Sequence, residues 1–161
     1  SCRKNLNKIK MLTSVHALVG VAIGRAVGDT SLVIPLSFAS HYVLDAIPHY
    51  SWKPLHMTKN HMVSIDSLVR GLFDAIEPIS GLLLAGYLII SAPGGLAMPM
   101  LMGLFFNLLP DLLVYLEWEY GIKRPFPIRQ IEMATHRHAR NVMGVLTQVV
   151  VLVPVLYYLL K

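Results

Sequence analysis

Cysteine is almost absent from this sequence: Cys2 is the only one among 161 residues. One thiol excludes an internal disulfide framework and a zinc site built from several cysteines. Charged residues are also scarce, at 14% of the chain, against about 25% in an ordinary soluble domain. Together with a hydrophobic content of 55% and a mean hydropathy of +0.57, this deficit indicates a membrane protein.

Long apolar stretches are what the sequence has instead. A membrane-spanning helix needs about 20 residues, with a range of about 17–25. Five stretches are long enough: residues 12–28, 31–48, 72–92, 96–118 and 142–160. The sequence therefore predicts an all-α, polytopic membrane protein with about five transmembrane helices, forming a single integral membrane domain over residues 1–161. A soluble all-α bundle with a very apolar core is the alternative.

Lysine and arginine are concentrated on one side of the predicted spans. If the five spans alternate, twelve of the 14 basic residues fall before the first span, between the second and third, or between the fourth and fifth. Basic loops stay in the cytoplasm, so we expect a cytoplasmic N-terminus in a bacterial or archaeal cytoplasmic (inner) membrane. The net charge of +5 then follows from topology and contact with anionic lipid, and nucleic-acid binding is not required. The basic segment 1–11 is either juxtamembrane or upstream translation of a protein that begins at Met11.

Ionisable side chains interrupt the apolar stretches near their cytoplasmic ends. In "SHYVLDAIPH" (residues 40–49), His41, Asp45 and His49 recur every four residues and so share one helix face. A lone charge at mid-bilayer costs about 2.5–3.5 kcal/mol on insertion scales, whereas a bound dication keeps carboxylates ionised without that cost. Imidazole and carboxylate are ligands that suit a divalent metal, with zinc favoured. The candidate metal ligands are His16, His41, Asp45, His49, Asp111 and His136.

Four of these candidates also have a plainer interpretation. His16 alone is compatible with an interfacial position at the start of a helix. His41 and Asp45 could form an internal hydrogen-bonded pair that fastens two helices together. His49 follows Pro48 at a helix end, where it would cap the helix or reach water. These alternatives remain open from the residues alone.

Three short motifs resemble those of a known family. They are Thr13-Ser14-Val15-His16 at the start of an apolar helix, "SHYVLD" (residues 40–45) and "LPD" (residues 109–111). These motifs are similar to those of the membrane-bound metal-dependent hydrolases, which include the LexA-regulated inner-membrane-associated hydrolases. By this resemblance His16 matches the early histidine, His41 and Asp45 match S-H-x-x-x-D, and Asp111 matches the aspartate of L-P-D. The sequence departs from L-P-D-x-D-H at Leu113 and Val114, and it has the two motifs in the reverse order.

The resemblance implies a metal-dependent hydrolase. We expect its site at the cytoplasmic leaflet, where the basic loops favour an anionic substrate such as a phospholipid or lipid-linked phosphate. Asp74 or Glu77, at the start of the third span, is the expected general base. A proton- or ion-coupled transporter is one alternative, although the outer halves of the spans contain no acid or histidine apart from Asp29 in a turn. A non-catalytic membrane scaffold is the other.

Overall fold

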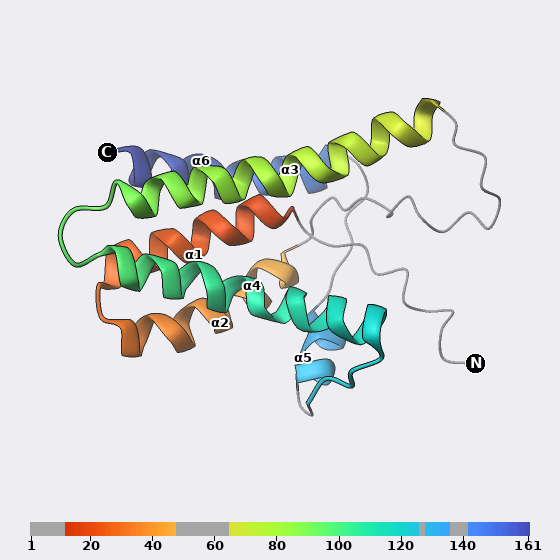
Figure 1. Ribbon diagram of the computed structural model, residues 1–161, viewed down its shortest axis with the longest axis horizontal. Helices are drawn as coiled ribbons and strands as arrows, with labels where there is room; N and C mark the ends of the chain where they lie inside the picture. Colours follow the sequence, from red (N-terminus) through yellow and green to blue (C-terminus); the bar gives the residue numbers. More distant parts are fainter. Residues whose placement is uncertain (1–11, 48–64, 126–127, 136–141) are drawn as a thin grey trace.

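The described part of the chain is helical. The computed structural model describes residues 12–47, 65–125, 128–135 and 142–161 (Figure 1), and no strand occurs in these ranges. The helices are α1 (Thr13–Val27), α2 (Thr30–Ala46), α3 (Ile65–Ile90), α4 (Ala97–Tyr120), α5 (Ile128–Thr135) and α6 (Val142–Leu160). The predicted all-α class is therefore confirmed for the described residues.

Five of these helices coincide with the five apolar stretches. The bounds of α1, α2, α4 and α6 agree closely with the predicted ones, whereas α3 begins at Ile65 instead of residue 72. The helix α5 was not predicted, because its eight residues carry no long apolar run. Hydropathy therefore located the apolar helices and missed the polar helical segments next to them.

One helix meets the requirements for crossing a membrane by itself. Ala97–Glu117 of α4 is a 21-residue segment with a mean hydropathy of 1.6, and no other helix in the described ranges is both as long and as apolar as a span requires. The helix α1 has 15 residues, which at about 1.5 Å per residue give roughly 22 Å, less than the roughly 30 Å of a bilayer core. The structure thus shows one candidate span where the sequence predicts five.

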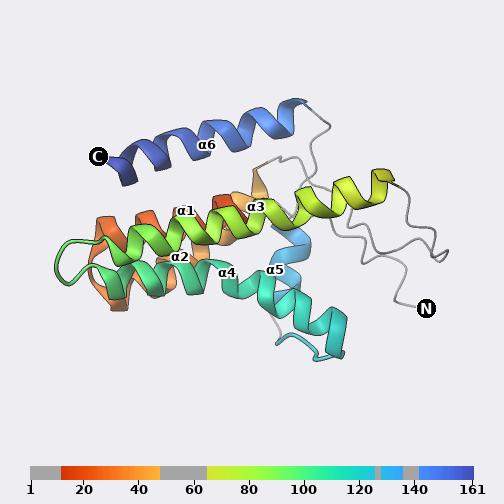
Figure 2. The same cartoon turned by 45° about the horizontal axis from the view of Figure 1, so that its top comes forward.

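The bundle is built around α1, which contacts α2, α3, α4 and α6, while α4 also packs against α2 and α3. Figures 1 and 2 show α6 running along one side of the bundle. The turn between α1 and α2, the turn between α3 and α4, and the C-terminus lie together at one end (Figure 1). The first residues of α1 and the last residues of α2 are therefore at the opposite end.

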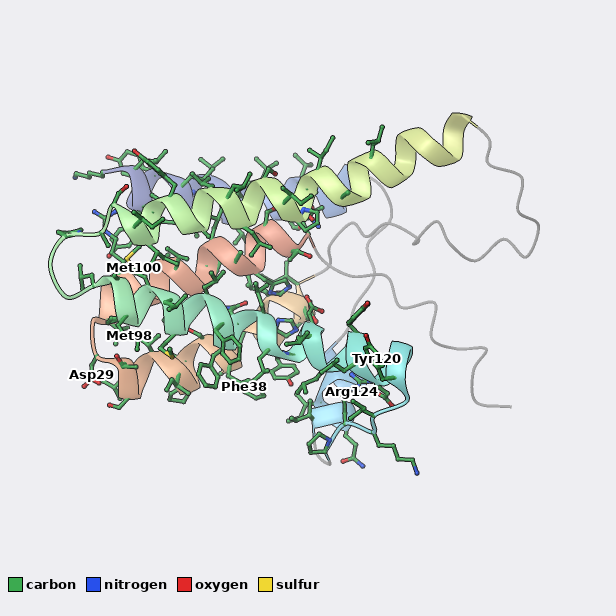
Figure 3. The ribbon with its side chains drawn as sticks, in the orientation of Figure 1. Asp29, Phe38, Met98, Met100, Tyr120 and Arg124 are labelled. Carbon is green, nitrogen blue, oxygen red and sulfur yellow. The ribbon has the colours of Figure 1, made fainter. Side chains whose placement is uncertain are left out.

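Glycines bring α1 and α4 into backbone contact. A Cβ on Gly20 would overlap the carbonyl group of Gly103, and a Cβ on Gly103 would overlap the carbonyl oxygen of Gly20. One turn further, a Cβ on Gly24 would overlap the backbone of Met100, which is itself buried. Figure 3 labels Met100 at this end of the bundle. Small residues that permit close backbone approach are typical of helix contacts in membrane proteins. The crossing fixes the position of α4 relative to α1.

Polar contacts close the turn end of the bundle. Asp29 caps α2 by accepting hydrogen bonds from the Ser31 backbone N–H at 2.8 Å and the Ser31 hydroxyl at 2.7 Å. These two hydrogen bonds lower the pKa of Asp29 below its ordinary value. Arg25 donates to the backbone carbonyl of Leu159 and lies 5.4 Å from the ring centre of Tyr158. Because the last carbonyls of a helix lack intrahelical partners, Arg25 fastens the C-terminal turn of α6 to α1.

Candidate metal centre

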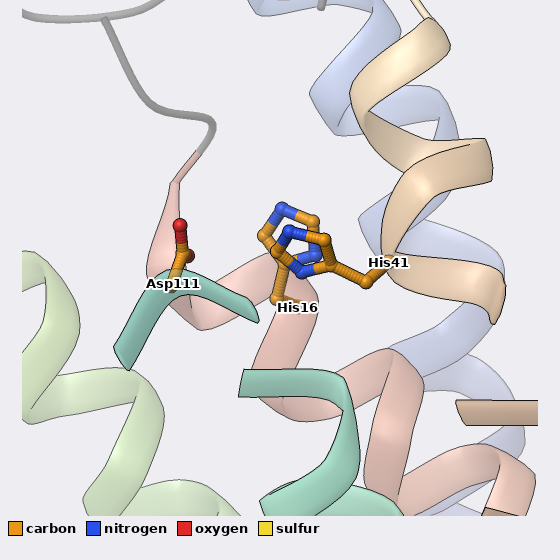
Figure 4. Close-up of side chains that lie close together, drawn as sticks. All are labelled: His16, His41 and Asp111. Carbon is orange, nitrogen blue, oxygen red and sulfur yellow. The ribbon is translucent and has the colours of Figure 1, made fainter. Parts of the chain in front are cut away.

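Two buried histidines from different helices stack against each other. His16 lies in the first turns of α1 and His41 near the end of α2, and their ring centres are 4.3 Å apart with an angle of 29° between the planes. The residues are 1% and 2% exposed, respectively. Figure 4 shows the two rings face to face between the helices. Two imidazoles with so little access to water require polar partners within the protein.

Asp45 supplies a partner to both rings. Its Oδ1 is 3.4 Å from Nε2 of His16, and its Oδ2 is 3.5 Å from Nε2 of His41. Because Asp45 follows His41 by four residues on α2, the two side chains lie on one face of that helix. The carboxylate is buried, so its charge also requires compensation nearby.

Asp111 approaches the histidines from a third helix. One ring nitrogen of each histidine and one carboxylate oxygen of Asp111 all lie within 4.8 Å of one another. Asp111 is half-buried and follows Pro110, which lies inside α4 and is fully buried. Figure 4 shows the Asp111 carboxylate beside the ring pair. Two imidazoles and a carboxylate this close together form a donor set that suits zinc or a similar divalent ion.

A hydrogen-bond chain through Asn107 determines which nitrogen of His16 carries the proton. The Ser40 hydroxyl donates to the Ser37 carbonyl at 2.9 Å, and the Asn107 amide N–H donates to the Ser40 oxygen at 2.7 Å. The amide oxygen of Asn107 then faces Nδ1 of His16 at 3.2 Å and accepts from it. Nδ1 therefore carries the proton, and in the neutral ring Nε2 carries the lone pair. Metal-binding histidines are commonly oriented by such a hydrogen bond from the other ring nitrogen.

This arrangement suits a cation between the rings and the carboxylate. A neutral His16 would direct the lone pair of Nε2 at the carboxylate of Asp45, 3.4 Å away, and a proton or a metal ion between the two atoms would remove this repulsion. On His41, Nε2 also faces Asp45, while Nδ1 is buried and makes no hydrogen bond of ordinary geometry to the described residues, with the Asn107 backbone near the ring. A buried polar atom without a well-formed hydrogen bond calls for an explanation, and a bound metal ion would be one.

The six predicted metal ligands fall into two groups. His16, His41, Asp45 and Asp111 come together from α1, α2 and α4, whereas His49 and His136 lie outside the described residues. Asp74 is in α3, but its side chain is not among those described.

Glu77 has a structural contact at the start of α1. Its Oε1 accepts a hydrogen bond from the backbone N–H of Ser14 at 2.7 Å. The first N–H groups of a helix have no intrahelical acceptor, and a carboxylate there is also favoured by the helix dipole. One turn further along α3, a Cβ on Gly81 would overlap Ser14, so the two helices touch at this point. Glu77 therefore holds α3 against α1 two residues before His16, and its predicted role as a general base stays a prediction.

Asn107 is the member of the site to which sequence analysis assigned no role. It is completely buried and contacts both His16 and Ser40. Its signal in the sequence was its position: a polar residue within an apolar stretch, four residues before Asp111, as His41 precedes Asp45. The site is thus formed where two such pairs, one on α2 and one on α4, face each other across His16.

The described part of the chain is thus an all-α fold with a buried histidine–aspartate cluster. Comparisons of this chain with family models, with curated proteins and with solved structures find no match. The resemblance to the metal-dependent hydrolases therefore rests on the three short motifs alone.

Proposed function

We propose that this chain is a membrane-embedded, metal-dependent hydrolase whose divalent ion is held by His16, His41 and Asp111, with Asp45 beside them. The observation that carries the proposal is the meeting of these side chains from three helices, with donor atoms of His16, His41 and Asp111 within 4.8 Å of one another. Zinc is the favoured ion, because two imidazoles with carboxylates form one of its common ligand sets.

Exposed apolar side chains support the membrane location. A soluble protein rarely exposes a contiguous apolar patch larger than a few hundred Å², yet large hydrophobic side chains are exposed on α2, α3, α4 and α6. On α3 they are Leu72, Ile76, Ile79, Leu82, Leu83, Tyr87 and Ile90. We propose that α1, α2, α3, α4 and α6 all lie in the bilayer with the N-terminus in the cytoplasm. The short helix α1 lies among the other helices, so its length does not have to match the bilayer by itself.

The chemistry follows from the ion and from the residues that hold it. A divalent ion bound here would polarise a phosphoryl oxygen and lower the pKa of bound water toward about 7. His16 and His41 hold the ion as neutral ligands, Asn107 keeps the ring of His16 oriented, and the buried carboxylates balance the charge. In the overall reaction the oxygen of water becomes bonded to phosphorus, the ester P–O bond breaks, and the alcohol leaves with a proton. Asp74 or Glu77 is the proposed general base.

Metal content of the purified protein tests this proposal. The full chain, purified in detergent and reconstituted in lipid nanodiscs, is expected to retain about one zinc, manganese or similar ion after dialysis, measured by elemental analysis. A chelator should remove the ion and abolish phosphoester hydrolysis, and restoring the metal should restore it. A chain that binds no stoichiometric ion under any of these conditions would contradict the proposal. The cluster would then be a proton-sharing contact between helices, as in the scaffold alternative.

A further inference from the structure

A buried arginine lies just beyond the candidate metal centre in the chain. Gly121, with φ of 70°, ends α4 and reverses the chain direction. Three residues later Arg124 is only 8% exposed, whereas its neighbour Lys123 is exposed. The Nε of Arg124 donates to a carboxylate oxygen of Glu117 on α4. Figure 3 shows Arg124 near the end of α4, next to α5. A guanidinium is rarely buried this far without a partner or a function.

A tyrosine hydroxyl lies in the same region. Tyr42 follows His41 on α2 and is 7% exposed, and its ring packs edge-on against Phe38 with centres 5.4 Å apart. Its hydroxyl has no hydrogen-bond partner within the part of the chain that the structure describes. A buried tyrosine hydroxyl usually has one. The helix α5, which follows Arg124 in the chain, packs against α2.

Geometry places this hydroxyl beside the metal cluster. The rings of Tyr42 and His41 meet edge-on, with centres 5.4 Å apart and an angle of 82° between the planes. Arg124 is bonded to Glu117, which follows Asp111 by six residues on α4. Tyr42 is therefore a neutral donor next to the ligands of the candidate ion, at the end of the bundle where Arg124 is buried.

We infer that Arg124 and Tyr42 bind the phosphoryl oxygens of the substrate at the metal centre. This inference rests on the proposed function. The ion attracts the phosphoryl oxygens, and Arg124 adds N–H donors to them. The Nε of Arg124 donates to Glu117, which holds the side chain in place, so the planar guanidinium still offers its two terminal NH2 groups to two phosphate oxygens. The Tyr42 hydroxyl donates to a third oxygen.

Phosphate binding to the metal-loaded protein tests the inference with a readout other than turnover. Inorganic phosphate is titrated into the full chain in nanodiscs and its affinity measured by calorimetry, with metal content determined on the same samples. We expect Arg124→Gln to weaken phosphate binding at least about tenfold and Tyr42→Phe roughly three- to tenfold, because each removes a donor to a charged group. Metal content should stay at the wild-type level. Lys123→Gln removes the same charge one residue away from an exposed side chain and should change the affinity less than about twofold.

A second arm distinguishes a lipid headgroup from a soluble phosphoester. The same variants are compared in nanodiscs containing phosphatidic acid and in nanodiscs of phosphatidylcholine alone, by measuring the lipid that co-purifies. Loss of phosphatidic acid binding in Arg124→Gln and Tyr42→Phe would identify the lipid headgroup as the ligand, and loss confined to inorganic phosphate would identify a soluble phosphoester.

Two results would overturn the inference, and only one of them would also overturn the proposed function. A metal-loaded wild-type chain that binds neither probe, or whose affinity is unchanged in both variants, would overturn this inference alone. A wild-type chain that holds no metal would overturn the proposed function together with it. If Arg124→Gln fails to fold, Tyr42→Phe decides, because it removes one oxygen atom from a ring that keeps its packing against Phe38.

Discussion

His41→Ala is expected to lower the affinity for the divalent ion by at least about 100-fold. A ligand is lost, and even the loss of a residue that only orients a ligand costs about 10–100-fold. The variant removes one imidazole of the stacked pair and the nitrogen that faces Asp45 at 3.5 Å. Metal affinity is measured by competition with a chromophoric chelator, on protein whose helical content is checked by circular dichroism.

Two further variants test whether the loss of metal affinity comes from the candidate site. Asn107→Leu keeps all the proposed ligands but removes the acceptor that orients His16, so we expect about a 10–100-fold loss of affinity. Asp29→Asn, at the opposite end of the bundle from the cluster, should leave the affinity at the wild-type value. Wild-type affinity in the folded His41→Ala protein would show that this histidine is not a ligand.

Gly20→Ala should destabilise the fold by about 2 kcal/mol or more, within or above the usual range of 1–3 kcal/mol for overpacking. The added Cβ would meet the Gly103 carbonyl, which is backbone and cannot turn aside, and would lie 2.9 Å from Cβ of Asn107. A loss of this size corresponds to a fall of roughly 4–8 °C in Tm. Because Asn107 contacts His16, metal affinity should fall as well.

Gly86→Ala is the matched control. Gly86 lies inside α3, and a Cβ added there would meet no described atom within 4 Å outside its own stretch of helix backbone. Alanine is favoured over glycine in a helix by about 1 kcal/mol, so Tm should stay the same or rise slightly. Equal Tm values for the two variants in thermal unfolding would contradict the close contact between α1 and α4.

Helix positions were largely predictable because apolar stretches of sufficient length become helices in either a membrane or a buried core. The start of α3 at Ile65 and the whole of α5 were missed, since both are more polar than the stretches that were counted. The prediction of five spans assumes that the helices lie in a bilayer. By length and hydropathy alone, only the segment Ala97–Glu117 qualifies as a span among the described residues.

The meeting of His16, His41, Asp45 and Asp111 was predictable in outline from their common depth and their spacing of four residues. What the spacing could not give is which side chains orient the others, since this depends on how helices cross. The crossing at Gly20 and Gly103 brings Asn107 to His16, and no feature of the linear sequence specifies that contact. Arg124 was likewise counted only among the basic loop residues, because burial of a single arginine after a helix end depends on the path of the chain.

X-ray absorption spectroscopy of the zinc-loaded protein tests the central claim most directly. We expect zinc with two imidazole ligands, each with a Zn–N distance of about 2.0–2.1 Å, and with carboxylate oxygens at about 2.0–2.2 Å. His41→Ala should halve the imidazole contribution to the spectrum. A spectrum with oxygen neighbours only, and no imidazole scattering, would show that His16 and His41 do not share an ion.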